Sequence, residues 1–206
     1  MSTQVRTGSV PAAAATPDGR SGNTLGRMTC LTLFTPVRRQ WSPVLKAALW
    51  LGKYVPMAQK HILQFDFIHF VRWTIVRELP HSGGAGQSTR LNYPYLFFES
   101  NFDGPWRHYI DAFAYIIPTD IRFVWGSGHA FPGPPPAEPL KAWIARNSME
   151  GGTYYCAYPE ASTRMVKSAL HVRERFEALQ AGARKMTPEQ FQEAYHRFVT
   201  DAQCHL

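Results

Sequence analysis

The stretch Tyr93–Phe113, "YPYLFFESNFDGPWRHYIDAF", joins an apolar strand pattern, a turn and the start of a helix. Aromatic and aliphatic residues dominate its first eight positions, which is typical of strands. The turn is "NFDG" (101–104), and after it apolar side chains recur at helical spacing until Pro118. We expect Gly104 to adopt the unusual φ of the turn and Asp103 to cap the helix that follows. The stretch therefore predicts a fold that contains both strands and helices.

Similar patterns extend on both sides of this stretch. Further strands are expected at Cys30–Phe34, Phe65–Val76, Ile121–Gly126 and Thr153–Tyr158, and further helices at Pro43–Tyr54, Leu140–Ile144, Ser162–Leu179 and Pro188–Ala202. The strands at Phe65–Val76 and Tyr93–Ser100 could pair antiparallel, although the polar loop between them is longer than an ordinary hairpin turn. The order predicts an α+β sandwich with a small, mainly antiparallel or mixed sheet, helices on one face and extra helices at the C-terminus.

Composition limits both the number of domains and the class of partner. The chain has 206 residues, of which 45% are hydrophobic and 14% aromatic, so we expect one α+β domain over residues 28–206. Residues 1–27 offer little to bury and are expected to be a disordered arm, with Met28 as an alternative start. The net charge of +7 would suit an acidic partner, but the basic residues are scattered, so nucleic acid is not expected. Three widely spaced cysteines favour a reducing, cytoplasmic setting.

Two of the expected helices carry apolar stripes. In residues 43–54 the stripe is Val44, Leu45, Ala48, Leu49 and Leu51, and in the long C-terminal helix it is Met165, Ala169, Val172, Phe176 and Leu179. The second stripe is expected to be buried. The first either packs on the core, rests on a membrane or covers a ligand cavity. Its lysines and its length rule out a spanning helix.

Four motifs carry a resemblance to known proteins: "FIHFVRW", "FESNFDGPWRHYIDAF", "VWGSGHAFPGP" and "YYCAYPEAS", all within residues 65–179. In these motifs the chain resembles a family of uncharacterised bacterial proteins with a shared strand-NFDG-helix signature, which is similar to the ferredoxin-like, dimeric α/β-barrel superfamily. The resemblance implies a ferredoxin-like sandwich, a homodimer and a cavity lined by strand residues. That superfamily includes cofactor-free monooxygenases, haem-dependent enzymes and ligand-binding proteins without enzymatic activity.

The haem-dependent branch is the one from which the sequence departs. Of the Gly-x-x-Asp-Gly motif of the haem peroxidases the chain has only the Asp103-Gly104 pair. We therefore expect no cofactor, and haem held by one of the histidines is kept as an alternative.

Three candidate site residues lie on the two central strand patterns. His69, among aromatic residues, could act as acid or base or as an axial haem ligand, or it could be a core histidine bonded to a backbone carbonyl. Arg72 needs a partner in so apolar a strand, and Glu99 is the candidate if the two strands pair. The pair is either structural or an anchor for the carboxylate of a ligand.

Two more candidates lie in turns. Asp103, with Asn101, could form a polar site at the mouth of a cavity, beside its expected capping role. His129, in a glycine-rich loop, could act as acid, base or ligand, or be an ordinary loop residue. The histidines and cysteines show no metal-binding spacing, so no metal is expected.

These residues predict a protein that binds a small hydrophobic or aromatic molecule in an aromatic-lined cavity and that could transform it without a metal. The catalytic candidates are His69, Arg72, Glu99, Asp103 and His129. The alternative is a dimeric scaffold or peripheral membrane protein that uses residues 43–60. Whether the chain is an enzyme stays open from the sequence.

Overall fold

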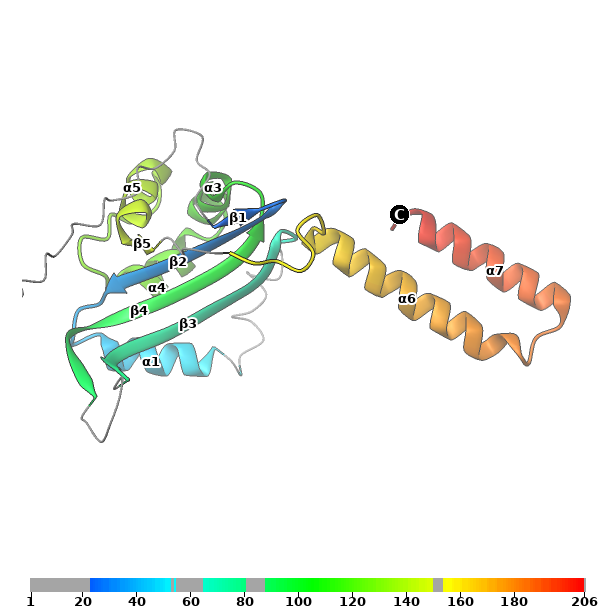
Figure 1. Cartoon of the computed structure of the whole chain (residues 1–206), viewed down its shortest axis with the longest axis horizontal. Helices are drawn as coiled ribbons and strands as arrows, with labels where there is room; N and C mark the ends of the chain where they lie inside the picture. The colour runs from blue at the N-terminus through cyan, green and yellow to red at the C-terminus, as the bar shows by residue number, and fades with distance from the viewer. Residues whose placement is uncertain (1–22, 53, 55–64, 81–87, 150–153, 206) are drawn as a thin grey trace, which may run out of the picture.

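The structure, a computed structural model, describes residues 23–52, 54, 65–80, 88–149 and 154–205. The strands are β1 (Thr24–Leu25), β2 (Met28–Pro36), β3 (Ile68–Leu79), β4 (Thr89–Asp103) and β5 (Ser148–Met149). The helices are α1 (Ser42–Leu51), α3 (Trp106–Ile116), α4 (Pro118–Trp125), α5 (Ala137–Asn147), α6 (Thr163–Ala183) and α7 (Pro188–Gln203). The fold is a mixed α+β fold with a small open antiparallel sheet, as Figure 1 shows.

The sheet has the strand order β1–β2–β4–β3, and the short β5 also pairs with β2. All of its pairs are antiparallel. The two long strands β3 and β4 follow each other in the chain, and Arg72 lies opposite Glu99 in their register. The antiparallel pairing that the sequence left open is thus present.

One face of the sheet carries the hydrophobic core. Successive side chains of a strand point to opposite faces, so every second residue of β2 and β4 faces the helices. The core includes Leu31, Leu33, Leu96, Phe98 and Phe102 from the strands and Leu45, Ile110, Phe113, Trp125, Leu140 and Trp143 from the helices. Helices α1, α3, α4 and α5 therefore all bury side chains in one cluster against this face.

The other face, called the open face here, has no helix packed on it among the described residues. It carries Phe70, Arg72, Phe34, Tyr95, Phe97 and Glu99, which alternate along the strands with the core residues. Phe70 is 53% exposed and lies near the start of β3, where it is paired with Asn101 of β4. An exposed aromatic face on an otherwise well-packed sheet is the main functional clue in the fold.

Two of the expected strands are wrong. Ile121–Gly126 lies in and directly after α4, whose first residue is Pro118, and Ile121 and Trp125 face the core one helical turn apart. A short apolar run does not distinguish a strand from a buried helix by its periodicity. Tyr154–Tyr158 has no strand either, and Thr153 lies outside the described residues.

The expected disordered arm is partly wrong. Residues 1–22 lie outside the described part of the chain, but Thr24 and Leu25 form β1 and pair with β2. Arg27 donates its backbone N–H to the carbonyl oxygen of Pro159 at 2.8 Å. Gly26 has φ +60°, and a Cβ there would meet Pro159 at 2.4 Å, so only glycine fits this close approach.

The C-terminal helices α6 and α7 form an antiparallel hairpin that projects from the body (Figure 1). Both helices have side-chain caps at their N-termini: Ser162 accepts from the N–H of Met165, and Thr187 forms a capping box with Gln190. The expected buried stripe of α6 is wrong, because Phe176 is 50% and Met165 53% exposed. The amphipathic spacing indicates which side of α6 contacts α7, but it does not indicate how much side-chain surface this contact buries.

Candidate functional site

His69 reaches the open face through an irregularity in β3. The β3–β4 register shifts between Ile68 and Phe70, so His69 is an extra residue and the strict alternation breaks. Strict alternation along β3 would put His69 on the same face as Val71, but its Nε2 lies 2.9 Å from Oδ1 of Asp103. Its partner is therefore a carboxylate and not the backbone carbonyl of the alternative interpretation.

Asp103 joins three elements at the end of β4. Its Oδ1 contacts His69, and its Oδ2 accepts the backbone N–H of Thr163 at 2.8 Å, in the first turn of α6. The expected cap on the next helix is wrong, because α3 has Pro105 at its N-cap and no side-chain capping bond. Gly104 does have the expected positive φ, +87°. Asp103 thus caps a helix that begins sixty residues later and holds it next to β3.

The predicted Arg72–Glu99 contact is confirmed. Arg72 Nη2 donates to Glu99 Oε2 at 2.7 Å, and the guanidinium also lies 5.4 Å from the ring centroid of Phe97. The Arg72 side chain is 64% exposed and that of Glu99 is 25% exposed. An ion pair so exposed adds little to stability. Because most of the Arg72 side chain is exposed, its guanidinium is also accessible to a ligand anion.

A second polar contact lies one row further along β4. Tyr154 donates its hydroxyl to Oδ1 of Asn101 at 2.6 Å, so the segment after β5 covers this end of the open face. Burial, followed by the nearby thiols of Cys30 and Cys156, raises the pKa of Tyr154 to about 12. Burial also raises the pKa of the Cys30 thiol. Tyr154 and Cys30 are therefore neutral, polar groups at neutral pH, not nucleophiles.

Aromatic rings surround these polar groups. The rings of Phe34 and Tyr95 stack at 4.4 Å with an interplanar angle of 8°. Phe97 lies under the Arg72 guanidinium, and the exposed Phe70 stands between Arg72 and His69 along β3. The combination of flat apolar rings with one cation and one imidazole suits an aromatic ligand that bears an acidic group.

His129 does not join this cluster. It lies after α4, where its N–H donates to the carbonyl of Pro36 and its ring contacts Tyr93 at 5.5 Å. Tyr93 and Asp103 are ten residues apart on β4, which corresponds to about 33 Å along a strand. Of the five residues named from the sequence, the structure brings His69 to Asp103 and Arg72 to Glu99, and it separates His129 from all four.

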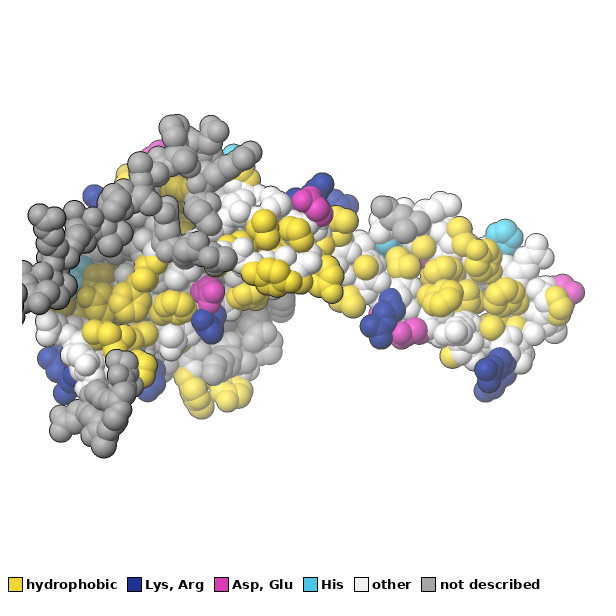
Figure 2. All heavy atoms as spheres, in the orientation of Figure 1, with side chains coloured by type: hydrophobic (Ala, Val, Ile, Leu, Met, Phe, Trp, Pro, Cys, Tyr) yellow, Lys and Arg dark blue, Asp and Glu magenta, His cyan; other side chains and the backbone are white. Residues whose placement is uncertain are grey.

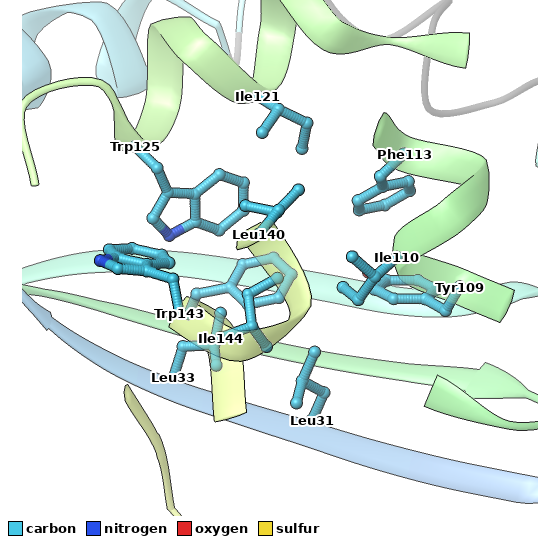
Figure 3. A pocket seen from close by; sticks show the side chains of 11 residues that line it. Leu31, Leu33, Tyr109, Ile110, Phe113, Ile121, Trp125, Leu140, Trp143 and Ile144 are labelled. Carbon is cyan, nitrogen blue, oxygen red and sulfur yellow. The ribbon is translucent and has the colours of Figure 1, made fainter. Parts of the chain in front are cut away.

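The interior of the core offers little room for a ligand. Figure 3 shows side chains such as Ile121, Trp125 and Phe113 pointing from the helices toward Leu31 and Leu33 of β2. The cavity between them has a volume of about 10 Å³, which is about the space that one water molecule needs. Any aromatic ligand of the chain would therefore bind outside this core.

The comparisons with known proteins add no name. No protein-family model, no curated protein and no solved structure matches the chain. In the described part of the chain, no group of three or more His, Cys, Asp or Glu side chains could hold a metal ion. The same residues include no helix that is both long enough and apolar enough to cross a membrane.

The sequence missed one more cluster, here called the arginine pocket. It is a cavity of about 210 Å³ between the start of α1 and the far ends of β3 and β4, lined among others by Arg39, Ser42, Arg77 and Arg90. These residues are spread over fifty positions, so no local motif marks them. Only the alternation of β3 and β4 combined with the position of α1 could have predicted their proximity.

Proposed function

We propose that the protein binds a small aromatic or hydrophobic molecule with an acidic group on the open face of its sheet. The observation that carries this proposal is the exposed guanidinium of Arg72, which lies 5.4 Å from the ring centroid of the half-buried Phe97, with the exposed Phe70 two residues away on the same face of β3. A flat ligand would stack on the rings and place its anion on Arg72. Glu99 holds the guanidinium in position from the adjacent strand.

The proposal includes an acid–base role for His69. The carboxylate of Asp103 can only accept a hydrogen bond, so Nε2 of His69 carries a proton, and in the neutral form of the ring Nδ1 is the nitrogen that can accept one. A histidine oriented in this way by a carboxylate can take a proton from a bound molecule and return it. This step needs no metal. His129 has no part in it, because it lies at the other end of the sheet.

We also propose that the fold is ferredoxin-like and that the protein forms a homodimer. The strand order β5–β2–β4–β3, with helices between β2 and β3 and between β4 and β5, supports the ferredoxin-like description. In the barrel-type proteins that the motifs resemble, two open faces meet and enclose the ligand. A second copy would close the site in the same way and would cover Phe70.

Binding is tested with 8-anilino-1-naphthalenesulfonate, a fluorescent probe with aromatic rings and a sulfonate. Arg72→Ala is expected to weaken its binding about tenfold, in line with the loss of one charge-assisted contact. The matched control is Arg146→Ala, which removes an exposed arginine from α5. If the two variants bound the probe with equal affinity, the probe would not bind at Arg72, and the proposal would lose the observation on which it rests.

Native mass spectrometry of the purified protein then examines the natural ligand and the subunit number together. A dimer with a bound aromatic acid supports the proposal and supplies a compound for turnover assays. In such assays His69→Gln should abolish turnover but retain binding, since Arg72 and Phe97 are unchanged. Loss of binding with His69→Gln would instead assign this side chain a structural role.

A further inference from the structure

The side of α1 that faces away from the core is apolar, which is unusual for a surface helix. At 100° per residue, Leu45 and Leu49 point inward, whereas Val44, Trp50 and Leu51 lie on the outer side. Their exposed fractions are 56% for Val44, 59% for Trp50 and 53% for Leu51. The expected single stripe is thus wrong for Val44 and Leu51. Both sides of α1 are apolar, and only one of them meets the core.

The arginine pocket opens at the first turn of this helix. Arg77 donates from Nε and Nη2 to Oγ of Ser42 at 3.2 and 2.9 Å, so its guanidinium has a fixed position. Ser42 itself is 1% exposed. Two further guanidiniums, those of Arg39 and Arg90, line the same cavity of about 210 Å³.

Among the described residues, none of Arg39, Arg77 and Arg90 forms an ion pair. Glu78 lies opposite Arg90 in the β3–β4 register, but its carboxylate accepts a hydrogen bond from Ser88. Glu78 is one negative charge near three positive ones, so the cluster keeps an excess of positive charge, and an anion in the cavity would offset the cost of that repulsion.

We propose that this surface docks on a bilayer of anionic phospholipids, with a lipid phosphate in the arginine pocket. The cavity presents planar guanidinium groups, which bind phosphate oxygens in pairs. Beside it, Val44, Trp50 and Leu51 would enter the boundary between headgroups and acyl chains, where tryptophan is favoured. A ten-residue helix is about 15 Å long and lies flat in that boundary.

The bilayer explains both halves of the surface together, which a soluble anion does not. A free phosphate would fill the arginine pocket and leave the outer side of α1 in water. An apolar partner protein would cover α1 and leave the three guanidiniums without an anion. The net charge of +7 acts in the same direction, because it attracts the chain to an anionic surface.

The proposal is tested by binding of the full chain to vesicles of phosphatidylcholine alone and of phosphatidylcholine with phosphatidylserine. The test variant is Arg39→Gln/Arg90→Gln, since neither side chain makes a hydrogen bond within the described residues. The matched control is Arg146→Gln/Arg175→Gln, which removes the same charge from α5 and α6. A third variant, Trp50→Ser, removes apolar area and no charge.

Wild-type protein and the control are expected to bind only the anionic vesicles, and to differ by less than twofold. A basic side chain near an anionic surface is worth about fivefold in affinity, so the test variant should bind about 25-fold more weakly. Trp50→Ser should also weaken binding. Equal losses in test and control variants would overturn the site, because the attraction would then be general. Binding of inorganic phosphate without vesicle binding would overturn the membrane assignment.

Discussion

Replacing Asp103 with asparagine should separate α6 from the sheet. The carboxylate accepts one hydrogen bond from His69 and one from the N–H of Thr163, at 2.9 and 2.8 Å. An amide of the same size has only one accepting oxygen and no charge, so His69 and the N–H of Thr163 no longer both donate to a carboxylate. Either one bond is lost, or His69 changes tautomer and accepts a weaker bond from the amide N–H. Both side chains are mostly buried, with exposed fractions of 17% for Asp103 and 16% for His69. The lost bond therefore cannot be replaced freely by water.

The expected loss follows from these contacts. A hydrogen bond to a charged group contributes about 1.5–3 kcal/mol, so Asp103→Asn should destabilise the fold by about 2 kcal/mol. With a urea dependence of about 2 kcal/mol per molar, the unfolding midpoint should fall by about 1 M. The six tryptophans report unfolding by fluorescence. Amide hydrogen exchange should show the first turn of α6 losing protection at concentrations where the sheet keeps it.

A double-mutant cycle refutes or supports the reasoning. Asp103→Ala, His69→Ala and the double variant should give a coupling energy of about 1.5 kcal/mol, since each of these single changes removes the contact between His69 and Asp103. Additive effects would show that the 2.9 Å contact contributes nothing, and the acid–base role of His69 would lose its basis. A matched control is Asp120→Asn on α4, which should leave the exchange of the α6 amides unchanged.

Three further predictions concern ionisation and capping. The pKa of Tyr154 in the folded protein is about 12, above the ordinary value of 10. Its contribution to stability is therefore complete below pH 10 and is lost as the pH rises toward 12. Across that range the unfolding midpoint should fall more steeply for wild type than for Tyr154→Phe. Because Cys204 is exposed and burial raises the pKa of Cys30, dithionitrobenzoate at pH 8 should react with Cys204 first, and Cys204→Ser should remove that fast phase. Thr187→Ala should destabilise α7 by about 1 kcal/mol, measured by amide exchange, whereas Thr187→Ser should have little effect.

The sequence predicted the long strands because their residues favour that structure wherever they lie. Aromatic and branched side chains fill both β3 and β4, and the sequence between them contains glycines, which predict a break between two strands. The contact between Arg72 and Glu99 could be predicted because a charged side chain in an apolar strand needs a partner. These inferences depended on local composition and on one long-range requirement.

The position of His69 could not be predicted in the same way. Alternation assigns a face to each residue only while the register holds, and the sequence does not reveal where one strand inserts an extra residue. The contact between Asp103 and the first turn of α6 spans sixty positions and leaves no local pattern. The strand predicted at Ile121–Gly126 was wrong for a different reason: the run is short and four of its six residues are apolar, so periodicity does not distinguish a strand from a helix.

The two proposed surfaces are compatible because they lie on opposite sides of the sheet. Helix α1 packs on the core face through Leu45, and its outer side points further away from the open face. A chain docked on a bilayer through Trp50 would therefore hold Arg72 and Phe70 away from the lipid. The bound molecule would arrive from the aqueous side. Mixing anionic vesicles with the protein should then leave its affinity for 8-anilino-1-naphthalenesulfonate unchanged, once the binding of the probe to lipid is subtracted. Competition between vesicles and probe would show that the two ligands share one surface, and one of the two assignments would have to be withdrawn.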